Sequence, residues 1–329
     1  MPFWKKTSPE DEAARIKAQQ EAEASRAAIQ AGGLPLNAQR RLQEEVAAGH
    51  PLFSSDLSTK EFSLTRSLGY QPLSQVMGSS IYQVGWQYTR NYTYNTRFSE
   101  RTVLTQAHQH AAQLALSRLD QEASLLKAHG VIGVRLNTRG YEWGQNMIEY
   151  TAIGTAIKLP NTPLPAHPFL SDLSGQEFWT LIQAGYYPVG IAFGYCSYYV
   201  QLGSNYTNQL KGWYRGGTYN QEIAPFSQGI YDSRHLAEQR VIEMAKRFNA
   251  FGVVGMHIDC QRNIIDYEQE REGYPTQYYM DLSIHFSAVG TAITAQRKDH
   301  VIAPPIPTLT FTDVRMGQRG ETRELTISE

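Results

Sequence analysis

One pattern occurs twice in this chain, and the repeat limits the possible folds more than any other feature. Ser-Asp-Leu-Ser-x-x-Glu-Phe occurs at residues 55–62 and again 116 residues later, at 171–178. Shorter echoes follow in the same order, namely Gly-Tyr-x-Pro at 69–72 and 185–188, Gly-Val-(Ile/Val)-Gly at 130–133 and 252–255, and Gly-Thr-Ala-Ile at 154–157 and 290–293. The spacing grows along the chain, which indicates insertions in loops of the second copy. We therefore expect two domains of roughly a hundred residues built on one plan.

Composition and charge narrow the class of protein. The 329 residues include 30 basic and 31 acidic side chains, so the net charge of −1 gives no overall field that would attract nucleic acid or an anionic membrane. No apolar run approaches the ~20 residues of a membrane span, and the N-terminal residues lack a signal-peptide core. Two cysteines, Cys196 and Cys260, form no paired motif. These features predict a cytoplasmic protein without a disulfide framework.

The expected organisation has four parts. Residues 8–49 are rich in Ala, Glu, Gln and Arg and poor in large apolar residues, which predicts a helical arm that is mobile or packs on a neighbour. The C-terminal stretch begins with Pro304-Pro305-Ile306-Pro307, which is typical of a stiff extended segment with at most one edge strand. The predicted parts are a helical arm at 1–50, a first repeat at 51–160, a second repeat at 167–297, and an extended tail at 298–329.

Each repeat is predicted to contain a strand, a Tyr-rich segment, a helix and then two strands. The first helix is expected at about 100–129, and the second is expected to run into Gly252. Gly130 and Gly252 are expected to close these helices in a left-handed conformation. Apolar side chains fall on one stripe of each helix, at Ala111, Ala115, Leu119, Ala123 and Leu126 and at Ala237, Val241, Met244, Ala245 and Phe248.

A β-hairpin is expected after each helix. In the second repeat, apolar residues alternate with polar ones along both strands, from Val254 to Cys260 and from Leu282 to Ala288. One apolar face and one polar face are typical of a sheet that is covered by a single helix. The sequence therefore predicts an α+β fold made of two β-α-β-β units.

These motifs and their order resemble the YbjQ-like family, whose label names heavy-metal binding. The residues that carry the resemblance are the Gly-Val-(Ile/Val)-Gly turns after an Ala-rich helix and the Gly-Thr-Ala-Ile ends of the hairpins. The resemblance implies a dodecin-like β-α-β-β module that closes into five-membered rings, so a tandem chain could close five subunits into two stacked layers. The arm, the Tyr-rich inserts and the tail depart from the short family pattern.

The hairpin of the second repeat offers a candidate metal site. Pairing its two strands places His257 opposite His285, with Asp259 two residues along on the same polar face. Opposed side chains in an antiparallel pair have Cβ atoms ~5 Å apart, so the three groups could bind Zn²⁺, Ni²⁺ or Cu²⁺. The same pairing in the first repeat places Arg135 opposite Glu149, a structural ion pair. The alternative is that His257 and His285 are half-exposed polar residues in that structural position.

Tyrosine and tryptophan are concentrated in one segment of each repeat. Such residues combine a large apolar area with a polar tip and are enriched at protein interfaces. We interpret these segments as contacts between subunits; a platform that stacks sugars or nucleobases, or ordinary sheet surface, are the alternatives. The residues assigned to the oligomer interface are Trp86, Tyr88, Tyr92, Tyr94, Tyr198, Tyr199, Trp213 and Tyr214.

Motifs of catalysis are absent from the sequence, which has no Gly-x-Ser-x-Gly, no phosphate-binding glycine loop and no His-Glu-x-x-His. We therefore expect no enzymatic activity and no obligate cofactor. The preferred hypothesis is a structural protein that forms a closed homo-oligomeric ring, pentameric with two stacked repeat layers. The alternative is a module that binds a divalent transition metal or a small ligand at subunit boundaries, and an enzyme with an interfacial site is a third possibility.

Overall fold

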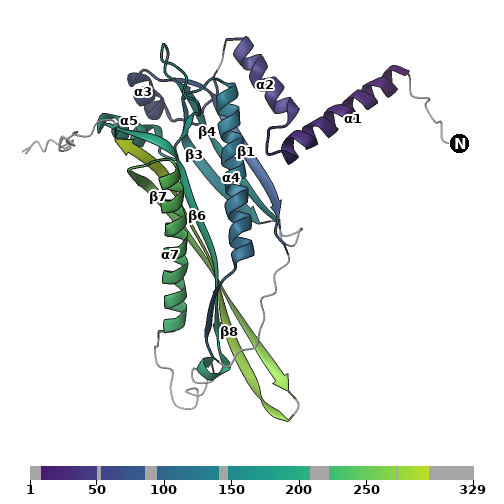
Figure 1. The fold of residues 1–329 in the computed structure, drawn as a ribbon, viewed down its shortest axis with the longest axis vertical. Helices are drawn as coiled ribbons and strands as arrows, with labels where there is room; N and C mark the ends of the chain where they lie inside the picture. Colours follow the sequence, from purple (N-terminus) through teal and green to yellow (C-terminus); the bar gives the residue numbers. More distant parts are fainter. Residues whose placement is uncertain are drawn as a thin grey trace, which may run out of the picture.

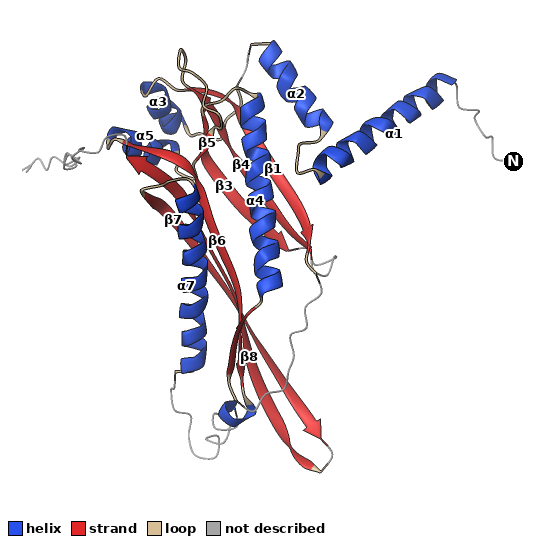
Figure 2. Cartoon of the chain, viewed as in Figure 1, coloured by secondary structure: helices blue, strands red, loops and turns tan. Residues whose placement is uncertain are grey.

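Two sheets, each covered by one long helix, make up the body of the protein (Figures 1 and 2). The computed structural model describes residues 9–49, 53–85, 95–140, 147–207, 222–271 and 273–295. The first unit contains α3 (Thr59–Ser67), β1 (Gln71–Gln83), β2 (Arg97–Glu100), α4 (Thr102–Leu125), β3 (Gly130–Gly140) and β4 (Met147–Lys158). The second unit contains β5 (Phe169–Leu170), α5 (Gly175–Gln183), β6 (Tyr186–Leu202), α7 (Ala224–Arg247), β7 (Gly252–Arg271) and β8 (Tyr274–Ala295). The α+β class is confirmed.

The order of strands shows that each unit donates a short strand to the other unit's sheet. The first sheet has the order β1-β4-β3-β5, and the second has the order β2-β6-β8-β7. The long strands occur in the predicted order along the chain, and the strand before each helix pairs with the last strand of the hairpin. The two short strands, β2 and β5, were not expected from the sequence, because neither has enough residues to show an alternating pattern.

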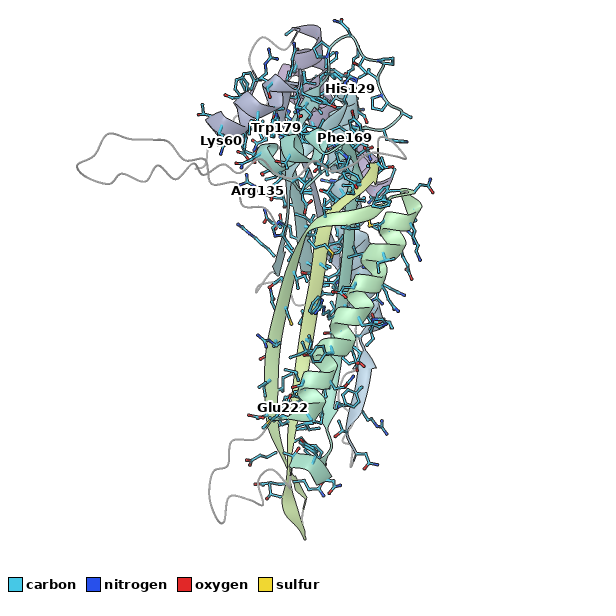
Figure 3. All side chains as sticks on the ribbon, turned by 90° about the vertical axis from the view of Figure 1, so that its left-hand side faces the viewer. Lys60, His129, Arg135, Phe169, Trp179 and Glu222 are labelled. Atoms are coloured by element: carbon cyan, nitrogen blue, oxygen red, sulfur yellow. The ribbon has the colours of Figure 1, made fainter. Side chains whose placement is uncertain are left out.

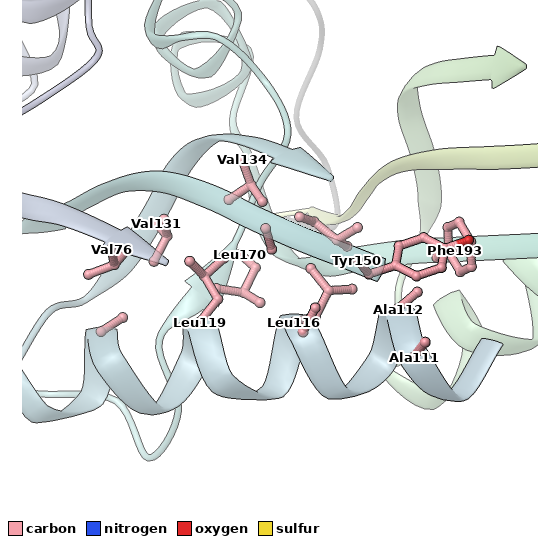
Figure 4. Packing of buried hydrophobic residues seen from close by; sticks show 14 of the residues in the cluster. Val76, Ala111, Ala112, Leu116, Leu119, Val131, Val134, Tyr150, Leu170 and Phe193 are labelled. Atoms are coloured by element: carbon pink, nitrogen blue, oxygen red, sulfur yellow. The ribbon is translucent and has the colours of Figure 1, made fainter. Parts of the chain in front are cut away.

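The helix stripes predicted from the sequence face their sheets. All five residues of the first stripe, Ala111 to Leu126, are fully buried, and Figure 4 shows part of this packing beneath the strands. In α7, Ala237, Val241 and Ala245 are buried, whereas Met244 and Phe248 are only partly buried. Small residues on the helix allow the sheet to approach closely, since alanine adds little bulk between the two layers.

Glycines on the strands make this approach possible. A Cβ atom at Gly78 would lie 2.0 Å from the carbonyl oxygen of Ala115, and one at Gly194 would lie 2.0 Å from that of Ala237. The two contacts are counterparts, because Gly78 and Gly194 occupy the same place in the two copies of the sequence pattern. Each long helix therefore rests directly on the backbone of its sheet.

The ends of the two long helices differ from the sequence expectation. The left-handed residues that follow α4 and α7 are Lys127 (φ 55°) and Asn249 (φ 53°). Gly130 and Gly252 instead begin β3 and β7. The prediction that these glycines close the helices is therefore wrong, because the helices end about three residues earlier than expected.

The repeated Ser-x-x-Glu motif begins a short helix in each unit. Ser58 caps α3 and Ser174 caps α5. The side chain of each serine accepts a hydrogen bond from the backbone N–H of the glutamate three residues later, Glu61 or Glu177. The glutamate carboxylate in turn accepts a hydrogen bond from the backbone N–H of the serine. This reciprocal capping box satisfies two N–H groups that a helix start otherwise leaves unpaired. The motif was visible in the sequence, but its helix was not predicted.

The N-terminal arm consists of α1 (Pro9–Gln30) and α2 (Leu36–Ala47), and α2 packs on α4 of the same chain. Leu34 and Leu42 are buried in the core of the first unit, and Arg118 of α4 donates hydrogen bonds to the carbonyl oxygens of Ile29 and Gly33. The helical arm is confirmed, and it is anchored through its second half. No helix in the described ranges has the length and apolar character needed to cross a membrane. The predicted tail, 298–329, lies outside the described residues.

Candidate assembly site

The junction between the two units is built by exchanged strands. Strand β5 lies parallel to β3, with Phe169 beside Gly130 and Leu170 beside Val131. Strand β2 pairs with β6, with Arg97 opposite Gln201. Because backbone hydrogen bonds run across both seams, the junction is part of the secondary structure of the chain, not a loose contact between two domains.

Helices α3 and α5 join the units at one end of the molecule (Figure 3). The indole N–H of Trp179 donates to the hydroxyl of Ser67 at 3.1 Å, and the backbone N–H of Gly175 donates to the carboxylate of Glu61 at 3.2 Å. Hydrogen bonding by Ser58 is the largest cause that lowers the pKa of Glu61, so this carboxylate stays charged near neutral pH. The capping motif that occurs twice in the sequence therefore also serves as a contact between the two units.

A buried cluster of aromatic and imidazole rings fills the centre of the junction. The ring of His108 stacks on Tyr195 with centroids 3.9 Å apart, and its Nδ1 lies 2.9 Å from the hydroxyl of Tyr150. The hydroxyl of Tyr195 lies 2.6 Å from Nδ1 of His285. Burial lowers the pKa of His108 to about 3 and also lowers that of His285, and it raises the pKa of both tyrosines. All four groups are therefore neutral near pH 7, and the cluster acts as hydrogen-bonded packing between the units.

The structure does not bring the predicted metal ligands together. His257 lies opposite Val289 and Asp259 opposite Ser287, while His285 lies opposite Gln261, four positions from the predicted pairing. The register shifts between Val254 and His257, beside the left-handed Gly255 (φ 66°). The strands already begin with Gly252 opposite Ile293, three positions from the predicted pairing with Gly290, and the bulge adds the fourth. Alternation along one strand sets neither the starting register nor the place of a bulge. The predicted opposition of the two histidines is wrong.

The described residues do not form a group of side chains suited to binding a metal ion. No group of three or more His, Cys, Asp or Glu side chains in this part of the chain is placed to hold a metal ion. His285 is partly buried and bonds to Tyr195 of the aromatic cluster, and His257 is exposed. The residues therefore do not fit a heavy-metal site at this hairpin, and metal binding by the chain stays a prediction.

The predicted ion pair of the first unit is also shifted by four positions. Arg135 lies opposite Ile153, and it is Arg139 that lies opposite Glu149. Arg135 instead contacts Asp56, with its Nη2 2.5 Å from the carboxylate, and Asp56 also accepts a hydrogen bond from Thr155. The register again shifts at a left-handed glycine, between Ile132 and Arg135.

The second unit repeats this arrangement with one difference. Asp172, the counterpart of Asp56, accepts a hydrogen bond from Thr291, so the Ser-Asp-Leu-Ser and Gly-Thr-Ala-Ile motifs meet in both units. His257 takes the place of Arg135, and Oδ2 of Asp172 is buried with no hydrogen-bond partner in the described structure. Burial raises the pKa of Asp172, and nearby His257 partly opposes this. The sequence shows both motifs, but only the structure shows that they touch.

The predicted interface aromatics divide into two groups. Trp86, Tyr88, Tyr92, Tyr94, Trp213 and Tyr214 lie outside the described residues, so their role at an interface stays a prediction. Tyr198 and Tyr199 are buried within the second sheet, where the hydroxyl of Tyr199 donates to Asp281 at 2.7 Å. Arg101 of the first unit lies over the Tyr199 ring, 4.3 Å from its centroid. These two tyrosines therefore belong to the core of the subunit, contrary to the expectation that they face another subunit.

Two comparisons with known proteins found matches to this chain. A family described as "Putative heavy-metal-binding" (YbjQ_1) matches residues 89–160, which span β2, α4, β3 and β4. The chain is also 36% identical over 219 residues to the encapsulin nanocompartment protein Rv1762c of Mycobacterium tuberculosis, covering 65% of this chain and 80% of the relative. The chain belongs to the Rv1762c family. No solved structure matches it significantly.

In this member of the Rv1762c family, a large pocket opens between the two units. It has a volume of about 870 Å³ and lies between α4, α7 and the connection from β4 to β5. Its walls are mainly apolar, with Tyr70, Phe169 and Phe248 among the lining residues. His167 and Asp120 lie at its edge, with Nδ1 and Oδ2 3.6 Å apart. Such a pocket suits an apolar ligand better than a charged one.

Proposed function

We propose that this chain is a non-catalytic structural subunit that assembles with copies of itself into a closed ring. Its two units are then tandem copies of one YbjQ-like, dodecin-like module. The observation that carries the proposal is the uneven use of sheet edges. Strand β5 covers β3 and β2 covers β6, whereas the outer edges of β1 and β7 pair with no strand in the described ranges. Long open edges are normally covered in soluble proteins, because they offer unpaired backbone groups to any other strand.

Comparison with the mycobacterial relative supports the same conclusion. That protein is named an encapsulin nanocompartment protein, and a structural role for this chain is consistent with that name. No residues in the described part of the junction are arranged as a catalytic centre: the two histidines and two tyrosines of the cluster are buried or, for His285, partly buried, they are neutral, and they bond mainly to one another. A surface for self-assembly uses the described features more fully than an active site does.

For the arrangement within the ring, we propose units side by side in one layer in place of the two stacked layers that the family resemblance implied. Helices α4 and α7 run in the same direction, and the two units meet edge to edge (Figure 1). This geometry favours units that alternate around one ring. Five chains, the number that the family resemblance implies, would then place ten units in the ring.

The mass of the particle in solution tests this proposal. Size exclusion coupled to light scattering should give a mass near five times 37.1 kDa, or a multiple of it, at micromolar concentration. Dilution over two orders of magnitude serves as the control, since a specific ring keeps its mass until it dissociates as a unit. A monomer at micromolar concentration would contradict the proposal.

A second candidate function, ligand binding between units, is favoured by the 870 Å³ pocket. Native mass spectrometry and elemental analysis of the purified particle would reveal an organic molecule or a metal present in a fixed ratio to the chain. A particle that carries neither, and that gains no thermal stability from added apolar compounds, would leave only the structural role.

A further inference from the structure

The first unit has a socket for a phenylalanine ring at the start of β3. A Cβ atom at Gly130 would lie 2.3 Å from the ring of Phe169, so only glycine leaves room for it. The segment that carries this ring adds to β3 through backbone hydrogen bonds, from Ser171 N–H to the carbonyl of Val131 and from Val134 N–H to the carbonyl of Ser171, both at 2.9 Å. The ring and the added strand together seal the end of the first unit.

The second unit has the same socket with nothing in it. Gly252, the counterpart of Gly130 at the start of β7, has no atom within 4 Å of an added Cβ. The neighbouring positions are also uncovered: Met256 is 38% exposed, whereas its counterpart Val134 is 3% exposed. Phe251, the counterpart of buried His129, is 75% exposed. These residues border a groove of about 490 Å³ between α7 and β7.

The first unit carries a phenylalanine in the position that fills such a socket. Phe53 stands before Ser55-Asp56-Leu57 as Phe169 stands before Ser171-Asp172-Leu173. It stacks on Phe62 with centroids 5.5 Å apart, just as Phe169 stacks on Phe178 at 5.7 Å. Yet Phe53 is 44% exposed and lies on no strand of the described structure. The ring of Phe53 is thus stacked on a phenylalanine in the same way as the ring of Phe169. Unlike Phe169, it has no glycine of the chain beneath it.

The surface beside Phe53 is uncovered as well. On β6, Phe193 packs into the core that the two units share and is 3% exposed. Its counterpart on β1, Met77, is 48% exposed, and Ile81 further along the same strand is 62% exposed. In the second unit, the corresponding face covers α4 and β3 of the first unit. In the first unit this face carries Phe53, Met77 and Ile81, and it is exposed.

We propose that the first unit of one copy docks on the second unit of the next copy in the way that the two units dock within the chain. Residues 53–55 add in parallel to the start of β7, and the ring of Phe53 fills the socket over Gly252. This inference rests on the proposed self-assembly and names its interface. The contact joins two different surfaces, so it continues head to tail until the ring closes.

Gly252→Val tests the socket without disturbing the subunit. Its Cβ and methyl groups would enter space that is open in the single chain, so folding should be unchanged, while the place of the Phe53 ring is blocked. The concentration for half-maximal assembly should rise roughly tenfold or more, because one central aromatic anchor is lost. Ile264→Ala, at a 54% exposed position far along β7, is the matched control and should leave assembly unchanged. Normal assembly of Gly252→Val, or an equal loss in the control, would overturn the proposal.

Disulfide trapping identifies the partner. Within the chain Val131 is the register partner of Leu170, so the corresponding positions between copies are Val253 and Ser54. In a background with half-buried Cys260 replaced by serine, the Ser54→Cys, Val253→Cys chain should form a ladder of covalent oligomers on oxidation. Chains with one cysteine each, mixed and reassembled, should stop at dimers. The Val131→Cys, Leu170→Cys chain is the control and should crosslink only within itself.

The outcomes separate the two proposals. A monomeric parent protein would overturn the self-assembly itself. An oligomeric parent that gives no ladder, or crosslinks only within one chain, would overturn this interface and leave the self-assembly standing. An unchanged mass for Phe53→Ala would mean that another segment, such as the chain's own C-terminal tail, covers β7, and it would overturn the proposal too.

Discussion

Individual residues at the junction show how burial sets their chemistry. His108 and His285 are titratable side chains, but burial in the stacked and hydrogen-bonded cluster leaves them little contact with solvent and lowers the pKa of both. A buried imidazole of this kind is stable only while it is neutral, since charging it would cost the desolvation of a cation. The junction between the units should therefore be sensitive to acid.

The acid sensitivity of the junction can be measured through His108. Its pKa is about 3 in the folded chain and near 6.5 when unfolded, so the unfolded chain binds more protons between these values. Its contribution to stability is then complete above about pH 6.5 and is lost as the pH falls toward 3. We expect the free energy of unfolding to drop by roughly 1 to 2 kcal/mol between pH 7 and 5 because of this group.

The variant His108→Gln should reduce this drop, although it lowers stability at pH 7. Urea unfolding at the two pH values measures both effects. His110→Gln is the control, because His110 is exposed on the same helix and should change neither value by much. An equal pH dependence for the parent and His108→Gln would show that the cluster is not what limits stability in acid.

At the scale of elements, the contact between each helix and its sheet depends on glycine. The helices rest on the strand backbone at Gly78 and Gly194, where a Cβ would meet a helix carbonyl oxygen at 2.0 Å. A side chain there must push the two layers apart along their length, which loosens every buried alanine of the stripe. The requirement is geometric, so a small residue such as alanine is already too large.

Gly194→Ala should therefore cost more than about 2 kcal/mol of stability, which is the range of overpacked cores. Thermal or urea unfolding measures the loss. Gly85→Ala is the matched control, because its Cβ would meet only the Val103 side chain at 3.8 Å. Full stability of Gly194→Ala would mean that the helix lies further from the sheet than described.

At the scale of the whole molecule, the two units share one core. Ile191, Phe193 and Tyr195 of the second unit belong to the same buried cluster as Leu116 and Leu119 of the first. Together with the exchanged strands, this core makes each unit part of the other's support. The two halves should therefore unfold together, although the sequence describes them as separate repeats.

Hydrogen exchange across a urea series tests this coupling. Amides of α4 and α7 should lose protection at the same urea concentration, since neither sheet is complete without the other unit. Phe193→Ala should lower both midpoints together, by about 3 kcal/mol of unfolding free energy. Early loss of protection in α7 with α4 still protected would show two independent domains.

The sequence by itself determined the order of the long elements. It also determined which side of the long helices and of β8 faces the core. These properties are local: a helix stripe from Ala111 to Leu126 and the alternation from Leu282 to Ala288 follow from the 3.6-residue and two-residue periods of the backbone. The resemblance to the YbjQ-like family followed from the same motifs. The family match covers residues 89–160 of the first unit, and the second unit's membership stays a proposal.

Only the tertiary structure decided which strands pair, in what register, and which aromatic residues lie inside. In each hairpin the pairing differs from the prediction by four positions. The strands begin three positions out of the predicted register, with Gly130 opposite Ile157 and Gly252 opposite Ile293, and a bulge at the left-handed Gly133 or Gly255 adds the fourth. The two-residue strand β5 and the four-residue strand β2 carry too little pattern to be predicted, yet they join the units. Register and strand exchange depend on contacts between residues far apart in the chain, and a local pattern holds no information about them.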